Sequence, residues 1–259
     1  MAVPSTPPAT GTGAGTGRRY GGADPAERRE RRRAALIDAG LDVFGKEGYA
    51  KASVKSVCEQ AGLTQRYFYE SFTDRADLLV AVYNDSVAFV RAATVAAAAG
   101  TAGPEVPATD AAQDRERVEG IAPEQVPDAA RAALGAFMSC LGDDPRRARV
   151  MLVEVVGVSP EIERVRMRAI HEWADLILAL ARGSRPPSDR ERLASVGLVG
   201  AVTQLLVDWY VALDEGAPDE SAHEQNAGEG SAHTRPAALD AILDVCVELF
   251  VAAYGRLLA

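Results

Sequence analysis

The sequence has few of the residues that build disulfide-stapled or metal-rich proteins. Among 259 residues there are 3 cysteines, Cys58, Cys140 and Cys246, and 3 histidines. Because the cysteines are odd in number and far apart, they indicate no disulfide framework and favour a reducing, cytoplasmic location. No uninterrupted apolar run reaches the roughly 18–20 residues that a membrane span needs. We therefore expect a soluble protein that makes no membrane contact.

The sequence also lacks any stretch that alternates polar and apolar residues for long enough to require a sheet. Its apolar residues recur at the spacing of helix faces instead, which predicts an all-α fold. The expected helices cover about 25–48, 53–61, 64–70, 73–99, 128–141, 145–157, 160–182, 188–214 and 237–258.

Composition divides the chain into regions. Residues 1–26 are mostly Pro, Gly, Thr and Ala, and a segment with so little apolar bulk is expected to be disordered. The segments 100–127 and 215–236 are rich in Pro, Gly and acidic residues, which is typical of flexible insertions. Between these regions we expect an N-terminal domain at 27–73 and a helical body at 74–259.

Charge is distributed unevenly between these regions. The net charge of −9 argues against bulk adhesion to nucleic acid or to an anionic membrane. Residues 18–75 nevertheless carry 12 Lys and Arg against 9 Asp and Glu. Five of these arginines, from Arg28 to Arg33, begin the first expected helix. They could form a solvated face interleaved with Glu, but we favour contact with phosphates or with a minor groove.

The stretch SVKSVCEQAGLTQRYFYESF has the order of a helix-turn-helix motif. Ser53 is a predicted N-cap of a short helix, Gly62 suits the left-handed turn that ends it, and Thr64 caps a second short helix. In this motif the second helix enters the DNA major groove. Gln65 and Arg66 on that helix can read adenine and guanine edges through paired hydrogen bonds, while Tyr and Thr hydroxyls suit phosphates.

The longer stretch ALIDAGLDVFGKEGYAKASVKSVCEQAGLTQRYFYESFTDRADLL resembles the N-terminal domain of TetR-like transcriptional regulators. The resemblance rests on fixed spacings such as Ala61-Gly62-Leu63, Tyr69-x-x-Phe72 and Leu78-Leu79. It implies an Ω-shaped homodimer with DNA-binding heads, a ligand-binding helical body, and dimerisation through the last two long helices. We expect Phe68 and Phe72 to be buried. The expected DNA contacts are Arg32, Arg33, Ser53, Lys55, Thr64, Gln65, Arg66, Tyr67, Tyr69 and Arg75.

Polar or aromatic residues within apolar helices of the body are candidates for a ligand pocket. Core or dimer packing explains each of them at least as well. Glu154 and Gln204 are the favoured pair, because each interrupts an apolar run. The full candidate set is Phe137, Met138, Met151, Glu154, Trp173, Gln204, Asp208 and Trp209.

The last two expected helices carry more apolar surface than one chain can bury. The helix at 237–258 has an apolar stripe at helical spacing, and the helix at 188–214 is apolar on nearly all sides. Two such helices from each chain would close a four-helix bundle about a two-fold axis, which would require a palindromic operator. The expected dimer contacts are Leu206, Tyr210, Leu243, Cys246, Leu249, Phe250 and Ala253.

Signals for an enzyme are weak. GTGAGTG at 11–17 lacks the flanking strand and the Lys-Ser/Thr of a phosphate loop. His171, Glu172 and Asp175 favour a helix surface over a metal site, and Glu220 with His223 falls in a polar insertion. We expect no catalysis, no cofactor and no metal.

These features predict a ligand-responsive transcriptional regulator, most simply a repressor. The homodimer would bind an inverted-repeat operator and leave it when a small molecule enters the body. A transcriptional activator of the same family is the near alternative. An all-α small-molecule-binding protein or enzyme with a vestigial DNA head is the more distant one.

Overall fold

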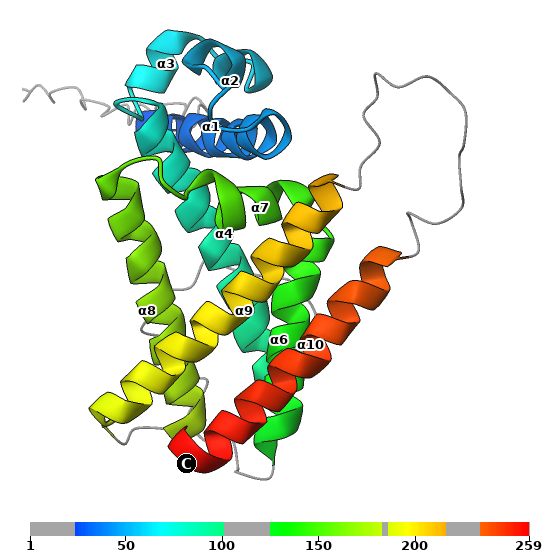
Figure 1. The fold of residues 1–259 in the computed structure, drawn as a ribbon. Helices are drawn as coiled ribbons and strands as arrows, with labels where there is room; N and C mark the ends of the chain where they lie inside the picture. Colours follow the sequence, from blue (N-terminus) through cyan, green and yellow to red (C-terminus); the bar gives the residue numbers. More distant parts are fainter. Residues whose placement is uncertain (1–23, 101–124, 183–185, 216–233, 259) are drawn as a thin grey trace, which may run out of the picture.

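The computed structural model describes residues 24–100, 125–182, 186–215 and 234–258, and within these ranges all regular structure is helical. The all-α prediction is confirmed for them. Three helices form a head that lies on a larger helical body, and α4 runs from the head into the body (Figure 1). The elements are α1 (Pro25–Glu47), α2 (Val54–Gln60), α3 (Gln65–Tyr69), α4 (Arg75–Ala98), α6 (Val126–Gly142), α7 (Pro145–Arg149), the π-helical turn η2 (Val150–Glu154), α8 (Pro160–Arg182), α9 (Asp189–Glu215), α10 (Thr234–Ala253) and the π-helical turn η3 (Tyr254–Leu258).

Local signals explain where the head helices begin and end. The Ser53 side chain accepts a hydrogen bond from the backbone of Ser56, which caps α2 as predicted. Gly62 has a φ of 64°, the left-handed conformation expected after α2. Thr64 precedes α3, but its side chain makes no capping hydrogen bond. Asp74 caps α4: its side chain accepts a hydrogen bond from the backbone N–H of Asp77, so this helix begins slightly later than the expected residue 73.

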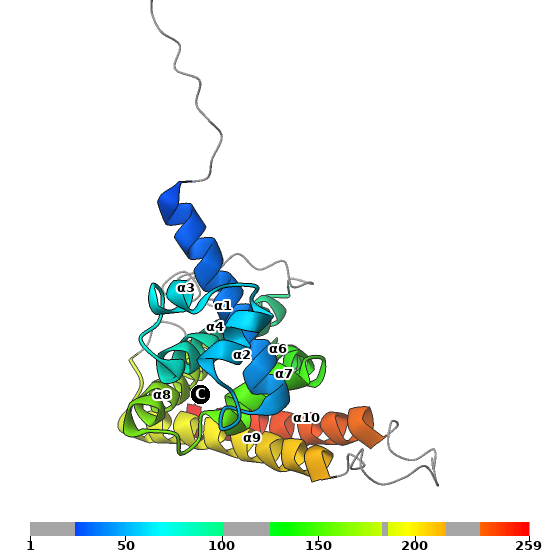
Figure 2. The same ribbon diagram turned by 90° about the horizontal axis from the view of Figure 1, so that it is seen from above.

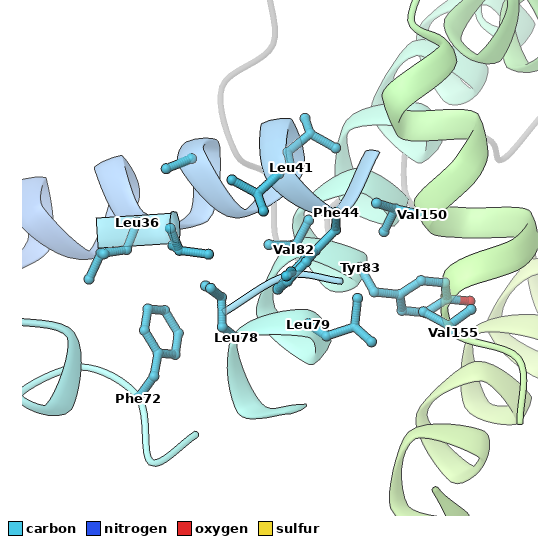
Figure 3. Packing of buried hydrophobic residues seen from close by; sticks show 14 of the residues in the cluster. Leu36, Leu41, Phe44, Phe72, Leu78, Leu79, Val82, Tyr83, Val150 and Val155 are labelled. Carbon is cyan, nitrogen blue, oxygen red and sulfur yellow. The ribbon is translucent and has the colours of Figure 1, made fainter. Parts of the chain in front are cut away.

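One hydrophobic core joins the head to the body. Phe68 and Phe72 are buried, as predicted, and pack in the same cluster as Leu36 of α1 and Leu78 of α4. Figure 3 shows this cluster continuing along α4 to Tyr83, and to Val150 and Val155 of the body. The head is therefore packed directly onto the body. A movement in the body can reach the head through this contact.

The body helices largely follow the predicted ranges. α8 has the predicted bounds, and α9 is displaced by one residue from 188–214. The single helix expected at 145–157 is instead α7 followed by η2, and it ends at Glu154. α6 begins at Val126, slightly inside the expected insertion. The tail and both insertions otherwise lie almost entirely outside the described residues.

α9 and α10 lie side by side on one face of the body (Figure 2). α4 and α9 are both long and apolar enough to span a membrane by length and composition alone, although charged or polar residues interrupt their apolar runs. In α4 the most apolar 18-residue window is 56% buried, as in the core helix of a soluble protein. The corresponding window of α9 is only 17% buried, so α9 leaves apolar surface that its own chain does not cover.

Candidate DNA interface and ligand cavity

The second helix of the helix-turn-helix has one buried side and one exposed side. Phe68 is fully buried and packs edge-on against the ring of Tyr69 and tilted against that of Phe72. On the other side Gln65, Arg66 and Tyr69 are exposed. The Arg66 side chain is 86% exposed and makes a single ion pair, with Glu70 at 3.4 Å. These three side chains are free to meet a DNA groove.

Two arginines of α1 brace this helix. The Arg32 guanidinium lies 4.5 Å from the ring centroid of Tyr67 and 3.5 Å from a carboxylate oxygen of Glu70. The Arg33 guanidinium lies 5.1 Å from the ring centroid of Phe72. Cation–π contacts of this kind hold a guanidinium against one ring face. Arg32 and Arg33 are thus half-buried supports of α3, unlike the exposed arginines one turn earlier in α1.

The remaining predicted DNA contacts have different surroundings. Lys55 is exposed on α2 and lies 3.7 Å from Glu59, while Ser53 caps α2. Arg75 is half-buried, and Nη1 of its guanidinium donates hydrogen bonds to the backbone carbonyls of Tyr49 and Ala52. It thereby ties the loop between α1 and α2 to the start of α4. This tie is the role that the structure supports for Arg75, and its expected contact with DNA stays a prediction.

The sequence of the head matches a known family of DNA-binding domains, in agreement with its geometry. Residues 36–82 match the profile of the family described as bacterial regulatory proteins, tetR family. The head is a TetR-family DNA-binding domain. The match contains α2 and α3 and ends within α4, so it covers the motif together with the start of the helix that connects the TetR head to the body.

The whole chain has the fold of solved regulators. The fatty acid degradation regulator FadR of Bacillus halodurans superposes with a TM-score of 0.58 at 17% identity, over 85% of this chain and 94% of its own. The transcriptional regulator FadR of Bacillus subtilis, solved in complex with stearoyl-CoA, superposes with a TM-score of 0.55 at 16% identity, over 85% of this chain and 97% of its own. At identities of 16% and 17% the likeness establishes the fold alone, and it does so for the body as well as for the head.

The helical body contains a cavity of about 470 Å³. Its wall is formed by α4, α6, α8, α9, α10 and η2. Four of the eight predicted pocket residues line it: Phe137, Met151, Trp173 and Gln204. The rings of Phe137 and Trp173 meet edge to face with centroids 5.1 Å apart, which joins the α6 and α8 sides of the wall.

The other four predicted pocket residues lie elsewhere. Met138 and Trp209 are buried in the core between α6, α9 and α10. Asp208 is exposed and accepts a hydrogen bond from the Gln204 side chain at 2.8 Å. Glu154 points to the head. Sequence alone could not separate Phe137 from Met138, because consecutive residues on a helix point about 100° apart and only packing shows which of them meets the cavity.

Two polar wall residues carried no signal in the sequence. Tyr83 is buried on α4, and burial raises its pKa to about 12 even though the Arg166 charge lowers it. Arg166 on α8 donates two hydrogen bonds from Nε and Nη2 to the Glu163 carboxylate. Tyr83 occupies a position in an apolar helix stripe, and Arg166 belongs to a charge-rich segment, so both resembled ordinary core or surface residues.

The predicted dimer contacts divide between core and surface. Leu206, Cys246 and Phe250 are buried within their own chain, so they are not available to a partner, and we withdraw them. Tyr210, Leu243 and Ala253 are half-buried. Leu249 is 43% exposed. The exposed small and apolar residues of α9 and α10 are Leu193, Gly197, Gly200, Val211, Ala212, Ala241, Val245, Leu249 and Ala252.

A network of ion pairs joins α1 to α7. Arg146 donates to Asp144 at 2.9 Å and to Asp42 of α1 at 2.5 Å. The hydrogen bond from Arg146, together with Lys46, lowers the pKa of Asp42. Burial alone would raise the pKa of Asp144, but Arg146 reverses this effect and the pKa is lowered. Both carboxylates are therefore ionised at neutral pH.

Among the residues that the structure describes, no group of three His, Cys, Asp or Glu side chains is placed to bind a metal ion. His171, Glu172 and Asp175 are exposed on α8, which fits a helix surface. Glu220 and His223 lie outside the described residues.

Proposed function

We propose that this TetR-family regulator is a cytoplasmic, ligand-responsive repressor that binds an inverted-repeat operator as a homodimer. In this proposal α3 enters the major groove, where Gln65 and Arg66 read base edges. Thr64, Tyr67, Tyr69, Ser53 and Lys55 lie around it as candidate phosphate contacts. Arg32 and Arg33 act mainly by holding α3, and the exposed arginines at the start of α1 supply further phosphate contacts.

The uncovered face of α9 and α10 supports the homodimer. α9 is apolar along its length, yet little of its most apolar window is buried by its own chain. Gly197 and Gly200 are exposed on this face, and nothing lies within 4 Å of the position that a Cβ would take on either residue. Small residues of this kind allow a second helix to approach closely. A two-fold axis through this face would present two heads to a palindromic site.

The observation that carries the ligand response is the position of η2. Residues 151–153 of this turn line the cavity. Val150, at its start, packs in the core shared with the head. Glu154, at its end, accepts a hydrogen bond of 2.7 Å from the backbone N–H of Tyr49, in the loop between α1 and α2. One five-residue turn thus touches both the cavity and the head.

A ligand that displaces η2 would shift the head relative to the body. The dimer would exist in two states, one with a head spacing that fits the operator and one with a spacing that does not. A ligand that binds one arrangement of η2 more tightly than the other would shift the population towards the state with that arrangement. The stearoyl-CoA complex of the Bacillus subtilis FadR, which has this fold, supports a cavity ligand with a long apolar part.

Two measurements on the full chain test this proposal: its binding to operator DNA and its effect on transcription. Fluorescence anisotropy should show tight, sequence-dependent binding to an inverted repeat upstream of the protein's own gene, with two chains per repeat. Transcription from that promoter in a purified system should fall when the protein is added. Binding equal to that of scrambled DNA would contradict the proposal, and a rise in transcription would identify an activator.

A further inference from the structure

The cavity follows one face of α8. Arg166, Ile170, Trp173, Ile177 and Leu180 all line it. From the first to the last of these residues the helix rises about 21 Å, at about 1.5 Å per residue. The space is therefore long, and it suits an extended molecule better than a compact one.

The wall is almost entirely apolar, with a single charge. Polar side chains contribute little beyond Tyr83, Thr94, Arg166, Thr203 and Gln204. Among the described wall residues, Arg166 is the only one that is charged at neutral pH. A cation in an apolar wall selects a ligand with one anionic group, because an opposite charge and directed hydrogen bonds offset the cost of removing it from water.

Arg166 retains donor capacity for such a group. Glu163 accepts from its Nε and Nη2, and Nη1 has no acceptor among the described residues. The Glu163 side chain is 39% exposed, so its carboxylate can turn to water when another anion arrives. Tyr83 adds a second donor. Its pKa of about 12 keeps the hydroxyl protonated at neutral pH, and its side chain lines the same cavity as Arg166.

These two donors lie at the end of the cavity nearest the head. Tyr83 lies beside Val155, and both belong to the core shared with the head (Figure 3). Val156 is exposed and lines the same cavity, and the Arg166 side chain is 25% exposed, so water reaches the charged group at this end. Away from Arg166 the wall is apolar: Leu176 and Phe250 are buried, and Val211 and Leu249 line the cavity while partly exposed. A ligand seated in this way has its polar group near the head and its alkyl part against the apolar wall.

We propose that the cavity binds a long-chain carboxylic acid, with the carboxylate on Arg166 and Tyr83 and the alkyl chain running along α8 towards Leu180. The proposal rests on the assignment of this cavity as the effector site. It differs from recognition of an acyl-CoA, in which the acyl carbonyl is an uncharged thioester and the anionic groups lie far from the chain.

The experiment measures binding to the full chain without DNA, by the fluorescence of its two tryptophans, of which Trp173 lies in the cavity wall and Trp209 in the core. The ligands are tetradecanoate, the uncharged tetradecanol and tetradecanoyl-CoA, each below its micelle concentration. Tetradecanoate should bind most tightly. Arg166→Gln should weaken it by about tenfold to hundredfold, the loss expected for hydrogen bonds to a charged group. Tetradecanol binding should not change.

Arg168→Gln is the matched control, because Arg168 is an exposed arginine on the same helix. It should bind tetradecanoate like the parent, and Arg166→Lys should restore part of the affinity. Tyr83→Phe, which keeps the ring, tests the second donor if Arg166→Gln is unstable. Equal binding of acid and alcohol, insensitivity to Arg166, or preference for tetradecanoyl-CoA would each overturn the proposal. Tight tetradecanoate binding that leaves operator affinity unchanged would contradict the effector role and not the assignment of the ligand.

Discussion

Two arginines of the head show how burial separates the roles of identical residues. Arg66 projects from α3 into solvent, whereas Arg75 is held by two backbone carbonyls and stacks on the ring of Tyr49 at 4.7 Å. The Arg75 guanidinium uses Nη1 for both carbonyls and is held against one ring, so its position is fixed by the head itself. Of these two arginines, Arg66 is the one whose side chain is fully open to a partner, which is why the proposal assigns base reading to it.

Replacing Arg66 or Gln65 with Ala should weaken operator binding by about 1–3 kcal/mol each and relax the preference at particular base pairs. The reason is the loss of paired hydrogen bonds to a base edge, while the buried side of α3 stays intact. Competition binding with single-base operator variants measures both effects. Arg168→Ala, which removes the same charge from the body, should leave the preference unchanged. If both head variants discriminate operators like the parent, α3 is not the reading helix.

The Arg146 network should give stability that depends on pH. The pKa values of Asp42 and Asp144 are lowered in the folded protein, below their ordinary value of 3.8. Their contribution is therefore fully present above about pH 4 and is lost as the pH falls through the lowered values. Arg146→Gln should reduce the free energy of unfolding by about 1 kcal/mol at pH 7, a modest loss because the Arg146 side chain is 37% exposed and partly screened by water.

Urea unfolding of parent and variant between pH 2 and 7 checks this prediction. The free energies of unfolding of parent and variant, plotted against pH, should converge below about pH 4. The control is Arg164→Gln, since the pair of Arg164 with Glu161 is exposed on α8, and it should follow the parent throughout. If the free energy of unfolding differs between parent and Arg146→Gln by the same amount at every pH, the ionisation of Asp42 and Asp144 is not the source of the stabilisation.

At the scale of elements, the contact between α1 and α7 leaves no room for a side chain at Gly45. A Cβ there would lie 2.4 Å from the Cβ and 2.6 Å from the Cα of Arg146. Both are atoms close to the backbone, which cannot turn away as the end of a flexible side chain could. The two helices therefore touch nearly backbone to backbone, and this contact sets how the head lies on the body.

Gly45→Ala should push α1 away from α7, with a loss of about 1–3 kcal/mol in stability, as in overpacked cores. Operator affinity should change as well, because the head shifts relative to the α9–α10 face. Thermal unfolding and operator titration measure the two effects. Gly135→Ala on α6 is the control, since its Cβ would meet Leu243 at an ordinary 3.7 Å, and it should be neutral or slightly stabilising. A Gly45→Ala protein as stable as the parent would show that the two helices separate at no cost.

At the scale of the whole molecule, self-association should depend on exposed residues of α9 and α10 and not on those buried in the chain. Val245 is 48% exposed on α10, whereas Phe250 is buried. Val245→Glu should weaken the dimer and the operator affinity together, because a charge would be buried in the interface and one head makes only half of the contacts.

Sedimentation velocity at micromolar concentration, with operator titration alongside, tests this prediction. Met167→Glu is the matched control, because Met167 is an apolar residue of α8 with 40% exposure. It should sediment and bind like the parent. A parent protein that is monomeric at this concentration yet binds a palindrome with full affinity would contradict the dimer.

Local signals in the sequence predicted most of the helices and the motif of the head, but not the division of 145–157 into α7 and η2. Helical spacing identified the body helices, and Ser53 and Gly62 marked the ends of α2, because caps and turns depend on residues only a few positions apart. Phe68 and Phe72 were correctly placed in the core for the same reason. Their spacing within one short segment left only one way to bury an apolar side.

The sequence by itself therefore determined the helical class through contacts between near neighbours, and it indicated a TetR-type head through its resemblance to that family. Only the tertiary structure decided which body residues meet the cavity, since Met138 and Trp209 face the core while Tyr83 and Arg166 face the cavity. It also turned Glu154 towards the head and Phe250 into its own chain. The physical reason is that a helix pattern gives the apolar faces of an element but not its partners, which depend on how helices distant in sequence pack together.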